Sequence, residues 1–125
     1  MITQDVIEVE QYIHKTWPKV RTVKPLRLSK LFPEPDNVGL KHIWKYGEAD
    51  LVVFRHGLPV CIVEPGGAHH FEEHQSHNDR RKWKLAEING VRCIHTVNGL
   101  QNRLSKRKLR QLLGGFIYGK NKSRN

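Results

Sequence analysis

Two apolar runs in the middle of the chain constrain the fold most strongly. Ala49–Phe54 and Leu58–Glu64 are each long enough for a strand, and Arg55-His56-Gly57 separates them. A short connection that contains glycine, placed between two such runs, predicts a β-hairpin with a three-residue loop. The second run is apolar at consecutive positions, which is typical of a central strand covered on both faces. The protein is therefore expected to contain a sheet with helices on both sides.

Helices and a further strand are expected around this hairpin. Near the N-terminus, apolar residues recur every three or four positions up to Trp17, before Pro18, which predicts a helix over residues 3–16 with Glu10 facing inward. Residues 76–89 are expected to form a second helix, ended by Gly90, and residues 91–97 a third strand. Because a helix separates this strand from the second one, the two should pair in parallel.

The chain of 125 residues suits one domain, which we predict to be an α/β/α sandwich with a small mixed sheet. Its core is expected over residues 48–97, with irregular structure or a short strand over the proline-containing stretch 18–47, a basic C-terminal helix over 105–113 and a disordered tail over 120–125. No apolar stretch approaches the length of a membrane span, and no signal-peptide pattern is present, so a soluble cytoplasmic protein without membrane partners is expected. Cys61 and Cys93 form no CxxC pair and are expected to be free and buried.

Positive charge is concentrated at the two flanks of the chain. The sequence has 22 Lys and Arg against 12 Asp and Glu, a net charge of +10. No acid lies between Glu10 and Glu34, or after Glu87, although both stretches are rich in Lys and Arg. Basic flanks favour a polyanionic partner, and the sequence therefore predicts binding to DNA.

Two carboxylates are expected to meet at one end of the hairpin. Counting from its loop places Asp50 opposite residues 62–64, and Glu64 ends the otherwise apolar second run. Two neighbouring acids repel each other unless a cation lies between them, and oxygen ligands at strand ends suit Mg²⁺, for which Mn²⁺ is expected to substitute. Asp50 and Glu64 are therefore the candidate metal ligands of a hydrolytic site.

These residues resemble a known family. Asp50 followed by Glu64-Pro65-Gly66 at the end of the next strand looks like the PD-(D/E)xK nuclease fold, which is the restriction-endonuclease-like fold. The segment over residues 64–81, EPGGAHHFEEHQSHNDRR, together with Gly90-Val91-Arg92, resembles the very-short-patch-repair endonucleases and their small bacterial relatives. The resemblance covers about residues 48–97.

The resemblance implies a metal-dependent DNA endonuclease and the roles of further residues. It implies that His70 handles the attacking water or the leaving group, that Glu10 on the first helix joins the acid cluster, and that Asp79 fixes His70 or joins the metal site; Asp79 is equally well read as a helix N-terminal acid. Gly66 is a departure, because the family places an acid or a lysine there. Small nucleases of this fold often pair to cut two strands, so the resemblance also allows a homodimer.

Basic residues on two helices are candidates for DNA contact. The helix that begins near the proposed site is expected to contact phosphate, and the C-terminal helix to steer the DNA backbone. The candidates are Arg80, Arg81 and Lys82 on the first of these helices, and Lys106, Arg107, Lys108 and Arg110 on the second. Trp83, Ala86 and Ile88 are expected to pack on the sheet instead.

Two other functions remain open from the sequence. Gly66 favours a DNA-binding module that kept the fold and lost the chemistry. The four histidines at positions 69, 70, 74 and 77 allow a zinc-binding interaction protein, although histidine spacing alone is a weak signal.

Overall fold

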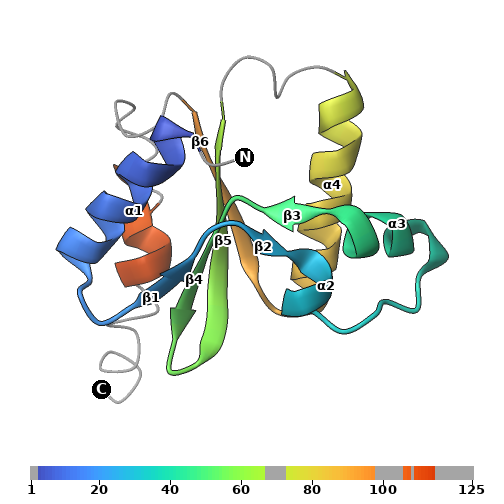
Figure 1. Cartoon of the computed structure of the whole chain (residues 1–125), viewed down its shortest axis with the longest axis horizontal. Helices are drawn as coiled ribbons and strands as arrows, with labels where there is room; N and C mark the ends of the chain where they lie inside the picture. The colour runs from blue at the N-terminus through green and yellow to red at the C-terminus, as the bar shows by residue number, and fades with distance from the viewer. Residues whose placement is uncertain (1–2, 67–72, 98–105, 108, 115–125) are drawn as a thin grey trace.

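A mixed four-stranded sheet organises the protein (Figure 1). The computed structural model describes residues 3–66, 73–97, 106–107 and 109–114. The strand order is β1-β4-β5-β6, with β1 antiparallel to β4, β4 antiparallel to β5, and β5 parallel to β6. The strands are β1 (Arg21–Val23), β4 (Leu51–Arg55), β5 (Leu58–Gly66) and β6 (Arg92–Val97). The predicted small α/β domain, its mixed sheet and the parallel third strand are confirmed.

The central hairpin has a tighter turn than the predicted three-residue loop. Arg55 pairs with Leu58, so the turn contains only His56 and Gly57, with φ angles of 54° and 79°. Two positive φ values are typical of a type I′ turn, whose twist matches that of the flanking strands. A bulge between Val53 and Phe54 then shifts the register by one residue, because it pairs Phe54 with Pro59.

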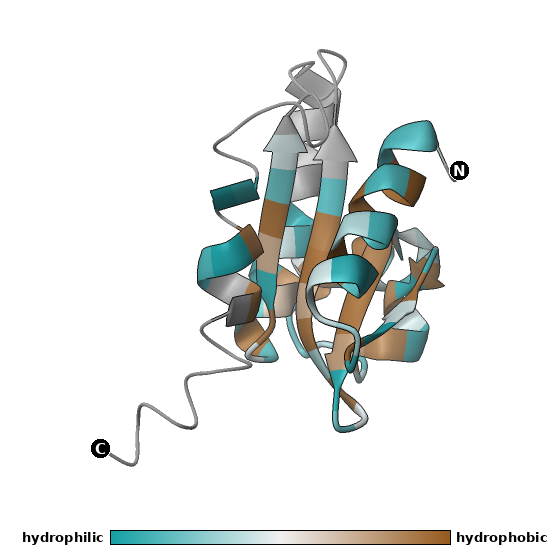
Figure 2. Ribbon diagram, turned by 90° about the vertical axis from the view of Figure 1, so that its left-hand side faces the viewer, coloured by the Kyte–Doolittle hydropathy of each residue, from teal (hydrophilic) through white to brown (hydrophobic). Residues whose placement is uncertain are grey.

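One face of the sheet is covered by α1 (Gln4–Thr16), close to the predicted bounds. The side chain of Thr3 caps the helix by accepting a hydrogen bond from the backbone N–H of Val6 (3.4 Å). Helix residues, strand residues and the C-terminal segment share one cluster on this face. Its members include Val6, Val9, Ile13, Leu51, Val53, Cys61, Val63, Ile94, Leu109 and Leu113. Figure 2 shows the apolar residues along the strands beneath this helix.

The opposite face is covered by α4 (Glu73–Ile88) together with α2 (Leu28–Leu31) and α3 (Val38–Tyr46). A second, two-stranded sheet of β2 (Leu26–Arg27) and β3 (Glu48–Ala49) lies beside them. The buried cluster of this face includes Leu28, Phe32, Leu40, Ile43, Ala49, Val52, Ile62, Leu85, Ala86 and Val91. The stretch 18–47, predicted to be irregular or to hold a short strand, therefore contains two helices and two short strands, and it supplies Leu28, Phe32, Leu40 and Ile43 to this cluster.

Two short polar contacts explain how the stretch between α2 and α3 folds. The Asn37 side chain accepts a hydrogen bond from the backbone N–H of Gly39 (2.8 Å) and begins α3. The Trp44 indole Nε1 donates to the carbonyl of Phe32 (2.8 Å), which ties α3 to the end of α2. Both contacts are local, but they are made by polar groups, and the periodicity of apolar residues does not reveal them.

Some expectations on packing change. Ala86 is buried as predicted, whereas Ile88 is 57% exposed and Trp83 43% exposed, so neither of these two packs fully on the sheet. Cys61 is a free thiol and fully buried as predicted, whereas Cys93 is only half-buried. Gly90 follows α4 with a φ of 73°, which confirms it as the residue that ends the helix.

The C-terminal basic helix is irregular. Lys106, Arg107 and Leu109 are helical, and Arg110–Gly114 forms a π-helical turn, η3. Ser105, Lys108 and the predicted tail over 120–125 lie outside the described residues. Among the helices that the structure describes, none is long and apolar enough to cross a membrane.

Candidate active site

Asp50 and Glu64 lie side by side at one end of the central hairpin, as the sequence predicts. Leu51 pairs with Val63, which places the preceding Asp50 opposite the following Glu64. The backbone N–H of Asp50 donates a hydrogen bond to Glu64 Oε2 (2.8 Å). The Glu64 residue is only 2% exposed, whereas Asp50 is half-buried. A buried carboxylate on a sheet is costly unless it is paired, so its partners decide what this pair does.

Lys82 of α4 supplies the partner of the buried carboxylate. Its Nζ lies 2.6 Å from Glu64 Oε1, and its side chain is 18% exposed. We expected Lys82 to contact phosphate, but the structure directs its ammonium to Glu64. Lys82 therefore places a positive charge next to the strand-end acid Glu64. Residue 66, two positions after that acid, is a glycine and carries no charge.

The proximity of the acids changes the protonation of Asp50. Burial, followed by the charge of Glu64 and a side-chain hydrogen bond with Glu64, raises the pKa of Asp50 from 3.8 to about 7, although Lys82 opposes the shift. Near neutral pH, Asp50 is therefore protonated in about half of the molecules in the absence of a cation. A divalent cation between the two carboxylates would replace that proton, and one or two carboxylates are the usual protein ligands of Mg²⁺.

His95 of β6 extends this row of polar residues, and the sequence analysis missed it. In the parallel register Glu64 is paired with His95. The His95 ring meets the Trp83 ring edge to face, with centroids 5.1 Å apart, so it points to the α4 face as Glu64 does. The signal was available, because a parallel third strand over residues 91–97 places one of its residues beside Glu64.

Glu10 lies in a different polar network, on the α1 face. Thr22 Oγ1 donates to Glu10 Oε2 (2.7 Å), Lys24 Nζ also bonds to Glu10, and His14 Nε2 is 2.7 Å from Thr22 Oγ1. Thr22 is paired with Val53, which packs on the α1 face. Glu10 faces inward as predicted, but the structure does not bring it into contact with Asp50 or Glu64.

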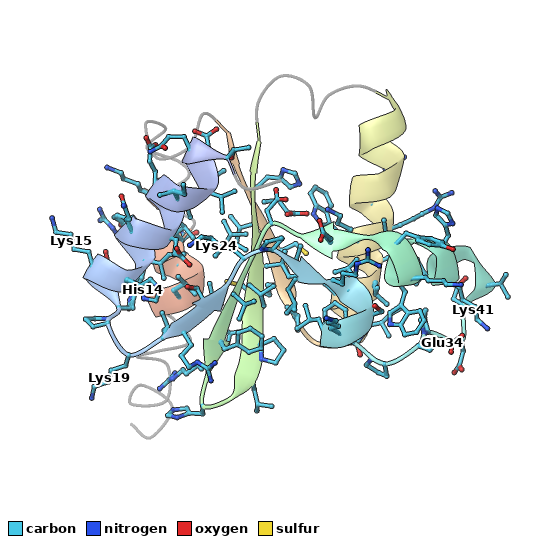
Figure 3. The ribbon with its side chains drawn as sticks, in the orientation of Figure 1. His14, Lys15, Lys19, Lys24, Glu34 and Lys41 are labelled. Carbon is cyan, nitrogen blue, oxygen red and sulfur yellow. The ribbon has the colours of Figure 1, made fainter. Side chains whose placement is uncertain are left out.

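The electrostatics of Glu10 fit a structural ion pair. Burial raises the pKa of Glu10, but the hydrogen bonds from Lys24 and Thr22 and the charges of Lys24 and His14 outweigh it, so the pKa lies below its ordinary value. Figure 3 shows Lys24 between α1 and the sheet, whereas Lys15 and Lys19 point outward.

The other predicted site residues lie partly or wholly outside the described residues. His69 and His70 lie outside the described residues. Asp79 belongs to α4 and precedes Lys82 by three positions, which places both on one side of the helix. Within the described residues, no three His, Cys, Asp or Glu side chains form a group that could hold a metal ion. The histidines of the zinc alternative are those at positions 69, 70, 74 and 77, and their side chains lie outside the described residues.

Basic residues of the C-terminal flank lie on the α1 side. Lys106 Nζ lies 5.8 Å from the Tyr12 ring centroid, and Arg110 Nε donates to the Tyr12 hydroxyl (3.4 Å). The C-terminal segment therefore lies against α1, and Arg107 and Arg110 are exposed there. Exposed basic residues also lie on α4, at Arg80 and Arg81. Positive charge thus flanks the sheet on both faces.

Comparison of the chain with protein-family models, with curated proteins and with solved structures gave no match.

Proposed function

We propose that the protein is a metal-dependent DNA endonuclease of the PD-(D/E)xK type, with a restriction-endonuclease-like fold. The observation that carries the proposal is the buried Asp50–Glu64 pair at the end of the hairpin, with Lys82 Nζ 2.6 Å from Glu64. Two carboxylates and a lysine on neighbouring elements are the groups that phosphodiester hydrolysis needs: ligands for a cation and a positive charge near the reacting phosphate.

The donor set fits Mg²⁺, because the two carboxylates repel each other and a cation relieves that repulsion. In this proposal Asp50 and Glu64 hold the ion, which when bound supplies a water of lowered pKa and positive charge toward phosphate. Lys82 holds the Glu64 carboxylate in place through its hydrogen bond. The lysine that the family places two residues after the strand-end acid positions the water, and in this proposal that part falls to His70.

His70 is the proposed general acid or base, on the resemblance alone. Asp79 would act through His70 or the metal site, also on the resemblance alone. Glu10 is proposed only as a structural residue that ties α1 to β1.

The test is cleavage of plasmid DNA with Mg²⁺, Mn²⁺ or EDTA. Asp50→Ala and Glu64→Ala should abolish cleavage while DNA binding stays equal or becomes slightly tighter, because each change removes negative charge next to phosphate. Retained cutting by both variants would refute the assignment. Since Glu64 is buried, Glu64→Gln and a thermal melt accompany the alanine variant.

Lys82 has a matched control on its own helix. Lys84 is exposed and pairs with Glu87 at 3.5 Å, away from Glu64. Lys82→Ala should lower single-turnover cleavage by about 100-fold or more, by the scale of one lost electrostatic contact in a reaction site, whereas Lys84→Ala should change it little. Equal effects of the two changes would leave Lys82 with no role in the reaction.

A DNA-binding module without chemistry is the second candidate. The observation that favours it is that Lys82 already neutralises Glu64 without a metal. DNA binding that weakens steeply with salt, combined with no cleavage under any metal condition, would establish this second function.

A further inference from the structure

A cavity opens along β6, the strand that pairs with the one carrying Glu64. Its volume is about 670 Å³, and it lies between α4 and the edge strand of the described sheet. The lining residues that matter are Trp83 and Glu87 from α4, and Arg92, Cys93 and His95 from β6. A cavity of this size accepts a planar ring system with its substituents.

Trp83 gives the cavity a surface for stacking. Its side chain is 43% exposed, which is unusual for a large apolar ring on a helix that faces a sheet. The edge-to-face contact with His95, at an interplanar angle of 74°, fixes the orientation of the indole. An exposed, oriented indole is the kind of surface on which an unstacked base packs.

The position of His95 connects the cavity to the candidate active site. His95 is the register partner of Glu64, and neighbouring strands lie about 4.8 Å apart. The end of the cavity that His95 lines is therefore one strand away from Glu64, and Asp50 lies on the other side of Glu64. A nucleotide whose phosphate lies at Asp50 and Glu64 can reach the cavity with its own base.

The polar groups of the cavity suit a nucleotide. Arg92 is exposed at the rim and carries a positive charge for the adjoining phosphate. The Glu87 carboxylate is an acceptor for the amino group of a cytosine or adenine, and Lys84, 3.5 Å away, limits its repulsion of DNA. Arg80 and Arg81, also exposed on α4, add positive charge along the same helix.

We propose that this cavity binds a single unstacked nucleobase of the DNA strand that is cut, and that Trp83 is its stacking platform. The inference rests on the proposed function, and it names the substrate class: DNA with an unpaired nucleotide beside the cleaved phosphate. A fully paired duplex would have to open before it could fill the cavity, at a cost of unpairing and unstacking.

Binding is measured in EDTA by fluorescence anisotropy, so that the result does not depend on cleavage. The probes are a DNA duplex with one unpaired nucleotide, the same duplex with an abasic site at that nucleotide, and a fully paired duplex. The wild type should bind the first probe about 5- to 100-fold more tightly than the abasic one, the range expected for one stacked base. Equal affinity for these two probes would overturn the proposal.

Three variants assign the preference to the cavity. Trp83→Ala should lose the preference for the base and keep the affinity for the paired duplex, whereas Trp83→Phe should keep most of the preference. Ile88→Ala is the matched control, because Ile88 is an exposed apolar residue of the same helix that does not line the cavity. A preference that survives in Trp83→Ala would refute the role of Trp83.

A second readout covers a Trp83→Ala variant that fails to fold. Trp17 is 5% exposed and Trp44 is half-buried, so Trp83 is the most exposed indole. Its fluorescence in the wild type should be quenched by the probe with the unpaired base and not by the abasic probe. Loss of metal-dependent cleavage in all assays, with this quenching retained, would refute the nuclease proposal and leave the base site standing. Cleavage without any base preference would do the reverse.

Discussion

Replacing Asp50 by asparagine should make the protein more stable, and the gain should grow with pH. The pKa of Asp50 is raised to about 7 by burial and by Glu64, so the folded protein favours the protonated acid. In the unfolded chain the group ionises near its ordinary value of 3.8. The folded state therefore binds more protons between these two pH values, and the free energy of unfolding of the wild type falls as the pH rises through this window.

Asparagine resembles the protonated acid and cannot ionise, so Asp50→Asn does not share this loss. A shift of about three pKa units corresponds to about 4 kcal/mol at most. Because Asp50 is only half-buried, solvent screening reduces the effect, and we expect the advantage of the variant to grow by about 2 kcal/mol between about pH 4.5 and pH 8.

The assay is urea unfolding of the wild type and of Asp50→Asn at both pH values, with EDTA present. Asp36→Asn is the control, because Asp36 is an exposed aspartate on the loop before α3. Parallel pH profiles for the wild type and Asp50→Asn would refute the argument that Asp50 and Glu64 are coupled. Added Mg²⁺ should then stabilise the wild type at pH 8, where Asp50 is mostly ionised beside Glu64, and leave Asp50→Asn nearly unchanged.

Three further changes test the fold around the site. Leu109→Ala should lower the free energy of unfolding by about 2–5 kcal/mol, because Leu109 is fully buried against α1 and the sheet; an effect below about 1 kcal/mol in urea unfolding would mean that the C-terminal segment does not pack there. Glu10→Gln should destabilise the protein by about 1 kcal/mol at pH 7, and thermal melts should show this difference vanishing as the pH falls below the ordinary value of 4.5 and through the lowered pKa of the wild-type carboxylate, which then loses its ion pair. Gly57→Ala should cost about 1–2 kcal/mol in urea unfolding although no atom crowds the position, because its φ is 79°; no loss of stability would contradict the strained turn.

The sequence predicts the part of the site that depends on strand pairing. Counting outward from the hairpin placed Asp50 opposite residues 62–64, and the observed pairing of Leu51 with Val63 puts it opposite Glu64. The predicted three-residue loop was one residue too long, because Arg55 belongs to the strand. The sequence does not indicate that His56 takes the positive φ of a two-residue turn. The bulge beside Phe54 changes the register only of the pairs that lie on the turn side of it. Asp50 lies on the other side, and its predicted position opposite residues 62–64 is confirmed.

The contacts made across layers could not be predicted in this way. Whether Lys82 reaches a phosphate or Glu64 depends on how α4 is rotated against the sheet, and that angle is set by the packing of Leu85 and Ala86. Likewise β1 has only three residues, and they form a strand because they pair with β4 about thirty positions further along the chain. A local pattern of apolar residues contains neither piece of information.

The meeting of Tyr12 with Arg110, 98 positions apart, has a consequence for how the protein is made. A ribosome releases the chain from its N-terminus, so α1 and the hairpin emerge long before Leu109 and Leu113. Until Leu109 and Leu113 have left the ribosome, the apolar cluster beneath α1, which includes Val63 and Ile94, is partly exposed to solvent. We therefore expect the growing chain to expose an apolar surface until Leu109 and Leu113 have left the ribosome, and to bind chaperones during that interval.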